Sequence, residues 1–325
     1  MTKILIVKSI SKNTAIYLIN AALIGLMGFV LIPFLTNNLP PDQYGKIEIY
    51  SVFVALLSGL LLVGGPTIVS GEYFKSRKKS LSLIGNHLMI IIVLVILGCI
   101  INSFLPYTYF YSLPKNVIYL LIITAGFLSI NTMNSTIYVL RARPISHGIF
   151  NIAFHLLALA LSIFLISYYT HNWCGRIYGI FIANVIFGLI SIQVLVKMGV
   201  QIGISKKSFG FIIRYGVPFL FIHLNGWINE VIDKLMISEI IGIGDTGIYA
   251  VGYKFGMITM LVGVAIGRSV TPLIYENLSL NTKKGDKNLV QIILFAAGIL
   301  FVLSIFVITI GPLLIKRLTH VSYHS

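Results

Sequence analysis

The chain has 325 residues, of which 57% are hydrophobic and only 10% charged, and it carries a formal net charge of +15. Soluble domains carry about 25% charged residues, so this composition excludes an ordinary soluble domain and indicates a polytopic membrane protein. The two cysteines, Cys99 in an apolar run and Cys174 in a short connection, indicate neither a disulfide framework nor a metal cluster. We expect no metal and no cofactor.

Nine apolar runs are long enough to cross about 30 Å of hydrocarbon as helices. The first is too long for the apolar region of a signal peptide and has no small-residue cleavage site after it, so it is predicted to be a retained helix. The predicted spans cover residues 14–36, 46–70, 83–106, 116–140, 146–169, 176–197, 212–237, 247–272 and 289–315. The predicted fold class is therefore an all-α polytopic membrane protein, and its connections are too short to hold a catalytic domain.

Most of the 24 Lys and Arg residues fall before the first span and after the even-numbered ones, as in the segments 75–79 and 283–287. Cytoplasmic loops are rich in these residues, so the N-terminus is predicted to be cytoplasmic. The same bias explains most of the net charge without a nucleic-acid partner. Lys316 and Arg317 fit this pattern badly, since they follow the ninth span on the outer side.

Polar residues form a stripe on the fourth predicted span. Asn131, Asn134, Ser135 and Tyr138 share one helix face. Polar side chains inside a membrane face a bundle interior or a watered cavity, so Asn131, Asn134 and Tyr138 are candidates for substrate binding. The alternative is that they only form hydrogen bonds between helices.

The seventh predicted span contains the sequence WINEVIDKLM. His223, Trp227, Glu230 and Lys234 follow steps of 4, 3 and 4 and lie on one face, with Asp233 on its flank. Glu230 and Lys234 are spaced as an i,i+4 ion pair. We assign Trp227 and Lys234 to substrate binding, and Glu230 and Asp233 to ion coupling. A purely structural ion pair, with Asp233 reaching the membrane interface, is the alternative.

In the eighth predicted span Lys254 and Arg268 are 14 residues apart, about 21 Å along the axis and on similar azimuths. Both are candidates for a cation site that binds an anionic substrate, although either could instead reach the membrane interface. Kinks are predicted at Gly64–Pro66 and at Gly216–Pro218, because proline interrupts helical hydrogen bonding.

The two halves of the chain show a weak repeat. A shift of 203 residues places Asp42 on Asp245 and Tyr50 on Tyr253, and it aligns the spans and basic loops as well. Six spans separate the copies, which predicts a parallel repeat. We therefore predict a six-helix N-terminal lobe at 1–200 and an incomplete C-terminal lobe at 201–325. On this scheme about three helices of a full second lobe are missing from the sequence.

The segment from Arg214 to Phe255 resembles the corresponding part of the bacterial O-antigen-unit translocases, the Wzx-type flippases. These belong to the multidrug/oligosaccharidyl-lipid/polysaccharide exporter (MOP) superfamily. The residues that carry the resemblance are Tyr215, Gly216, Pro218, Asp233, Lys234, Gly247, Tyr249, Tyr253 and Lys254. The segment LPPDQYGKIEIYSVF adds to it in the first half. The chain departs from the family in length, since its members usually have twelve or more spans.

The resemblance implies a two-lobed bundle around a cationic cavity in the bacterial inner membrane. The implied substrate is an undecaprenyl-diphosphate-linked oligosaccharide, which is flipped from the cytoplasmic to the periplasmic leaflet for surface polysaccharide synthesis, including the O-antigen of lipopolysaccharide. The implied partners are this lipid-linked glycan, membrane lipids, a polysaccharide polymerase and a chain-length regulator.

Three alternatives stay open. A multidrug cation antiporter of the same superfamily would favour an acidic cavity, whereas the intramembrane cations here are at least as numerous as the acids. A membrane enzyme is the second alternative. A polyprenyl-phosphate glycosyltransferase would need closely paired acids in a cytoplasmic loop, and those loops offer only Glu72 alone and Glu276 and Asp286 ten residues apart. An O-unit polymerase would be expected to have a long outer loop, and the outer loops here are short. A truncated flippase without activity is the third. We expect a transporter rather than an enzyme.

Overall fold

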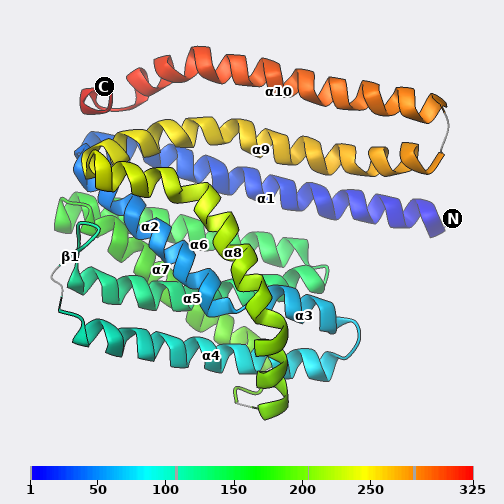
Figure 1. Cartoon of the computed structure of the whole chain (residues 1–325), viewed down its shortest axis with the longest axis horizontal. Helices are drawn as coiled ribbons and strands as arrows, with labels where there is room; N and C mark the ends of the chain where they lie inside the picture. The colour runs from blue at the N-terminus through cyan, green and yellow to red at the C-terminus, as the bar shows by residue number, and fades with distance from the viewer. Residues whose placement is uncertain (1, 107–108, 204, 281–282, 325) are drawn as a thin grey trace. The chain divides into compact units, whose positions relative to one another are not determined.

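The computed structural model describes residues 2–106, 109–203, 205–280 and 283–324 (Figure 1). Side chains at 2–15, 18, 109, 261, 264–265, 267–289 and 292 lie outside this description. Within it the chain forms ten α-helices, one hairpin of two strands with two residues each, and two short helical turns. The predicted all-α class is confirmed.

Short connections join the helices. The elements are α1 Thr2–Asn38, α2 Pro41–Leu62, α3 Gly65–Tyr73, α4 Arg77–Phe104, β1 Tyr109–Phe110, β2 Leu113–Pro114, α5 Lys115–Leu140, α6 Pro144–Leu165, the π-helical turn Ile166–Thr170, α7 Cys174–Lys197, α8 Lys206–Ile240, α9 Ile243–Leu280, α10 Lys283–Leu318 and the 3-10 turn Val321–Tyr323. The strands β1 and β2 pair antiparallel and close the connection between α4 and α5.

Among the described residues, eight helical segments are long and apolar enough to cross a membrane. They overlap eight of the nine predicted spans. The remaining one, 247–272, lies in α9, where many side chains are outside the description, and stays a prediction. Large apolar side chains such as Ile96, Ile101 and Phe104 of α4 are exposed. This exposure fits contact with lipid, which is as apolar as the side chains themselves.

The prediction of one continuous span over 46–70 is wrong. Helix α2 ends at Leu62, and Val63 and Gly64 both adopt left-handed backbone with φ of 44° and 67°. Pro66 then occupies the first turn of α3, where its missing N–H removes no helical hydrogen bond. The predicted kink is thus a complete break. By contrast, α8 continues through Pro218 without ending.

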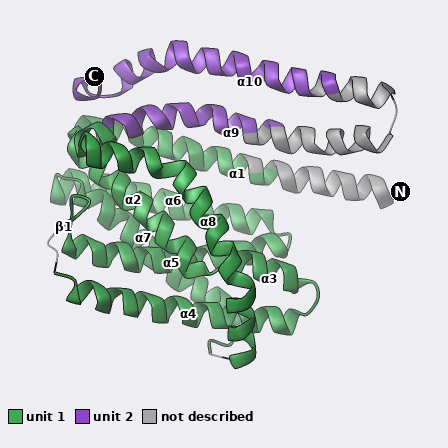
Figure 2. Ribbon diagram, in the orientation of Figure 1, with its two compact units in different colours: residues 1–247 green, residues 248–325 purple. Residues whose placement is uncertain are grey.

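The chain divides into two compact units, residues 1–247 and residues 248–325 (Figure 2). In the first unit, Tyr50 and Thr124 share a hydrogen bond of 2.8 Å, and the Ser129 hydroxyl donates to the Ser58 carbonyl at 2.9 Å, so α2 is joined to α5. In the second unit, apolar side chains of α9 and α10 line one small cavity. The lobe boundary at residue 200 stays a prediction.

Candidate substrate and ion site

Helix α8 packs closely on α2 because small residues face large ones. Gly59 of α2 leaves room for the His223 ring, which a Cβ at position 59 would overlap. Gly64 meets Phe219, and Gly216 of α8 lies directly against the Val63 carbonyl. These contacts bring residues 216–223 of α8 against the end of α2 and the turn that follows it.

The contact between α2 and α8 buries an ion pair. The Lys234 ammonium lies 3.5 Å from the Glu48 carboxylate, and the two side chains are only 10% and 8% exposed. Glu48 follows the start of α2 by seven residues, about 10 Å along the helix. The i,i+4 partner suggested by spacing, Glu230, has an exposed side chain. The structure therefore gives Lys234 an acidic partner on another helix, 186 residues away.

Arg176 is a second cation that interacts electrostatically with Glu48, although the two form no ion pair within 4.0 Å in the described part of the chain. Its guanidinium donates to the Ser162 hydroxyl at 2.9 Å and to the Ala158 carbonyl at 3.4 Å, both on α6. It also interacts electrostatically with Glu48 and Tyr44, and with His155 of α6. We call Glu48, Arg176 and Lys234 the charge triad. Four helices, α2, α6, α7 and α8, hold it together.

The triad carries more positive than negative charge. With Glu48 ionised, the two cations leave a formal excess of one positive charge within this group. Burying ionised groups is unfavourable unless they are paired and hydrogen-bonded, so such a cluster persists only where the surrounding helices fix its geometry. Asp233, half-buried and next to Lys234 on α8, lies outside this count.

Trp227 is held in place on the α2 side. Its indole N–H donates to the Val52 carbonyl at 2.9 Å, and its ring lies 6.3 Å from the Phe53 ring. Phe53 in turn contacts Phe110 and Tyr111 near the hairpin. The predicted substrate residue thus also fastens α8 to α2.

The predicted polar stripe of α5 faces α7. Ser191 donates to Asn131 at 2.9 Å, Asn134 donates to Ser191 at 3.2 Å, and Asn131 lies 3.5 Å from the Asn184 side chain. Asn134 and Ser191 are fully buried. Tyr138 is half-buried, with its ring 6.0 Å from that of Phe150. The two asparagines therefore form the interhelical network that was the alternative explanation for the stripe.

The remaining predicted residues are distributed as follows. Asp233 is half-buried and accepts a hydrogen bond from the Lys234 N–H at 2.8 Å. Lys254 is half-buried in the second unit. Arg268 belongs to α9, but its side chain lies outside the described residues. Among the described residues there is no group of three or more His, Cys, Asp or Glu side chains that could hold a metal ion.

Neither Glu48 nor Arg176 was among the candidate site residues predicted from the sequence, so the charge triad was missed. One signal was available. Gly175 and Gly179 flank Arg176 at helical spacing, and small residues at this spacing permit close helix approach. A Cβ at Gly179 would lie 2.5 Å from the Ser162 hydroxyl, the group that receives the guanidinium hydrogen bond.

Comparison with known proteins gives the family context. Residues 10–278 match the model of a family described as "Polysaccharide biosynthesis protein". The chain is 20% identical over 276 residues to "Lsg locus putative protein 1" of Haemophilus influenzae, covering 82% of this chain and 66% of that protein. It is 22% identical to an "Uncharacterized membrane protein" of the same organism, covering 85% and 68%. The chain thus spans about two thirds of the length of these curated relatives.

Solved structures similar to this chain are membrane transporters. A MATE protein in its straight conformation superposes with a TM-score of 0.59 at 14% identity, covering 95% of this chain and 73% of that one. A MOP superfamily transporter from Pyrococcus furiosus gives a TM-score of 0.59 at 15% identity, covering 96% and 73%; its report describes a binding pocket of reverse polarity. The fold is therefore that of the MATE-like transporters.

Proposed function

The chain belongs to the polysaccharide biosynthesis protein family, and from this premise we propose that it serves to flip an undecaprenyl-diphosphate-linked oligosaccharide from the cytoplasmic to the periplasmic leaflet. The observation that carries the proposal is the family match over residues 10–278 on a transporter fold. The setting is the bacterial inner membrane, with the N-terminus in the cytoplasm and a polymerase and chain-length regulator acting next on the flipped glycan.

The charge of the buried groups supports an anionic substrate. A diphosphate is held best by charge-assisted hydrogen bonds from Lys and Arg. In the triad, Lys234 pairs with Glu48, and Arg176 interacts electrostatically with the same carboxylate. Lys254 and Arg268 are proposed as further cations for the diphosphate. A cationic drug would instead favour an acidic cavity, whereas the intramembrane cations counted from the sequence are at least as numerous as the acids, which disfavours the multidrug antiporter alternative.

The mechanism that we propose starts at the Glu48–Lys234 ion pair. A diphosphate that reaches Lys234 competes with Glu48, and this exchange loosens the contact between α2 and α8. If α8 begins the second lobe, as the repeat predicts, the exchange links substrate binding to movement of one lobe against the other. Glu230 and Asp233, next to the pair on α8, are proposed to carry the coupling ion. Trp227 and Tyr138 are proposed sugar contacts, and Asn131 and Asn134 are proposed to hold the cavity wall in shape.

The proposal is tested by placing Lys254→Ala at the chromosomal locus of the natural host. The expected result is loss of surface polysaccharide while the protein remains in the membrane, because the substrate diphosphate loses a cation. Lys197→Ala is the matched control, since Lys197 is exposed in the last turn of α7. Wild-type levels of surface polysaccharide in the Lys254→Ala strain would contradict the role of this cation.

A further inference from the structure

A cavity distant from the charge triad lies where α4 and α8 begin. Its volume is about 460 Å³, and it is lined by Lys78 and Ser82 of α4, by Gly199, Gln201 and Gly203 of the connection after α7, and by Ser205. Helix α8 begins at Lys206, next to the cavity, and Lys234 lies 28 residues further along the same helix, about 40 Å away. The cavity and the triad therefore lie toward opposite ends of this helix.

Close packing fixes the walls of the cavity. The buried Asn86 side chain accepts a hydrogen bond from the Ser205 N–H at 2.8 Å and donates to the Ser82 carbonyl at 2.7 Å. Ser82 and Ser208 share a hydrogen bond of 2.9 Å between α4 and α8. Gly85 lies directly against the Gln201 carbonyl, where no larger residue would fit. Hydrogen bonds and close packing within the first unit therefore hold the walls of this cavity in place.

Two helices begin beside this cavity with basic residues in their first turns. Helix α4 begins with Arg77, Lys78 and Lys79, and α8 begins with Lys206 and Lys207; neither first turn contains an acid. The N-terminus of a helix carries partial positive charge and favours anions. The basic residues in these first turns therefore add to the positive electrostatic potential at the helix N-termini. A bound anion would reduce the repulsion among these positive charges.

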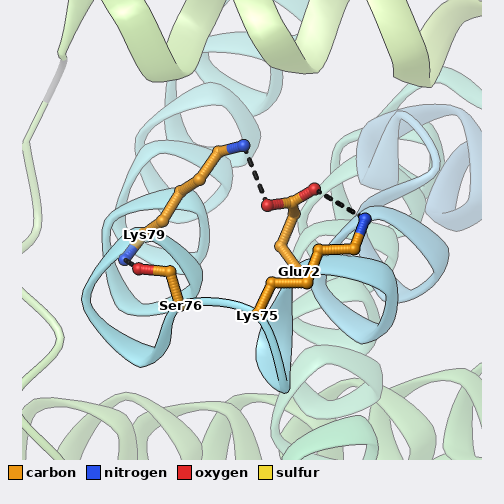
Figure 3. A network of polar contacts seen from close by, with 4 residues as sticks. All are labelled: Glu72, Lys75, Ser76 and Lys79. Carbon is orange, nitrogen blue, oxygen red and sulfur yellow. Dashed lines mark hydrogen bonds and ion pairs between the residues drawn. The ribbon is translucent and has the colours of Figure 1, made fainter.

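Glu72, the acidic residue near the start of α4, already forms ion pairs with two lysines. Figure 3 shows Glu72 between two lysines, with its carboxylate 2.8 Å from Lys79 and 3.6 Å from Lys75. The Lys79 ammonium also lies 3.9 Å from the centre of the Phe211 ring of α8. Lys78 has no acidic partner within 4.0 Å among the described residues. Lys78 is thus the cation that is available to a ligand in the cavity.

We propose that this cavity binds the phosphate headgroup of an anionic membrane lipid. The ammonium of Lys78 would contact the phosphate oxygens. Ser82 and Gln201 would contact the polar remainder of the headgroup. The site lies on the side that the basic loops assign to the cytoplasm, where anionic lipids attract basic residues. It is distinct from the proposed transport site and does not depend on it.

The test uses the purified full chain and native mass spectrometry with phosphatidylglycerol, with phosphatidylcholine as the neutral reference lipid. Lys78→Gln is expected to weaken phosphatidylglycerol binding about fivefold, the contribution of one basic side chain near an anionic membrane surface. Gln201→Trp, which fills the cavity without changing charge, is expected to weaken it as well. Lys197→Gln removes an exposed lysine outside the cavity and is expected to leave binding unchanged.

Equal phosphatidylglycerol binding by wild type, Lys78→Gln and Gln201→Trp would overturn the proposal. So would an equal loss in Lys197→Gln, since the effect would then be general surface charge. Glycerol 3-phosphate identifies the source of the phosphate. Displacement of the lipid at millimolar concentration would show that a soluble phosphate ester suffices, whereas retention of the lipid would assign the cavity to membrane lipid.

Discussion

At the residue scale, the Glu48–Lys234 ion pair is the feature on which the proposed mechanism depends. Each side chain is almost fully buried, and the pair joins two helices far apart in sequence. Removing one member of a buried pair leaves the other charge in an environment of low dielectric, which is far more costly than the pair itself is stabilising. A single substitution in the pair should therefore change the stability of the protein by a measurable amount.

We expect Glu48→Gln to lower the free energy of unfolding by about 3–5 kcal/mol, because the negative charge beside Lys234 and Arg176 is lost. Thermal or denaturant unfolding of the purified protein in detergent measures the change. The double variant Glu48→Gln with Lys234→Met should recover much of the loss. Glu230→Gln, at an exposed position of the same helix, is the control and should have little effect. A loss from Glu230→Gln as large as that from Glu48→Gln would argue against the assigned pairing.

A second residue-scale prediction concerns pH. The Lys79 ammonium, followed by that of Lys75, holds the pKa of the Glu72 carboxyl below its ordinary value of 4.5. A carboxyl with a lowered pKa stabilises the fold above its ordinary pKa, and this contribution is lost as the pH falls through the lowered one. Wild type should therefore unfold at a higher temperature than Glu72→Gln at pH 7, and the two should converge as the pH falls through the lowered pKa of Glu72. A difference that persists undiminished at low pH would be inconsistent with the ion pairs of Figure 3.

At the element scale, the packing of α8 on α2 depends on glycine at the contacts. Gly216 meets the Val63 carbonyl, whereas Gly226, also within α8, has no atom within 4 Å of the position that a Cβ would take. The same substitution at these two positions thus separates the effect of helix contact from the effect of helix propensity.

Gly216→Ala should destabilise the protein by about 1–3 kcal/mol, because the added methyl group forces the helices apart. Gly226→Ala should be neutral or stabilising by up to about 1 kcal/mol, because alanine favours the helix. Both are measured by thermal unfolding of the purified variants. Equal effects of the two substitutions would show that α8 does not pack on α2 at Gly216.

The helices themselves could largely be predicted from sequence, because an apolar run long enough to span a membrane has few alternatives to a helix. The sequence at Gly64–Pro66 predicted a kink but not a complete break after Leu62, and the partners of the charged residues could not be predicted. Spacing along one helix suggests local pairs such as Glu230 with Lys234, but the partner of Lys234 comes from α2. The asparagine stripe of α5 was recognised from its period, while only packing against α7 shows that Asn131 and Asn134 bond to Ser191 and its neighbours.

At the scale of the whole molecule, the family and the fold are the main support for the proposed activity. The chain belongs to the polysaccharide biosynthesis protein family and has the fold of MATE-like transporters. The first unit contains a charge triad with excess positive charge, as an anionic substrate would require. The cavity at the start of α8 is a separate feature that we assign to membrane lipid.

The most direct measurement of translocation is leaflet accessibility in proteoliposomes. The purified protein is reconstituted with a fluorescent undecaprenyl-diphosphate-linked oligosaccharide in both leaflets, and a membrane-impermeant reductant quenches the outer label. Protein-free vesicles should lose about half of the fluorescence, because only one leaflet is accessible. Vesicles that contain the protein should lose nearly all of it, and this extra loss should be absent with Lys254→Ala. Quenching that stops at half in the presence of the wild-type protein would contradict the proposed flipping.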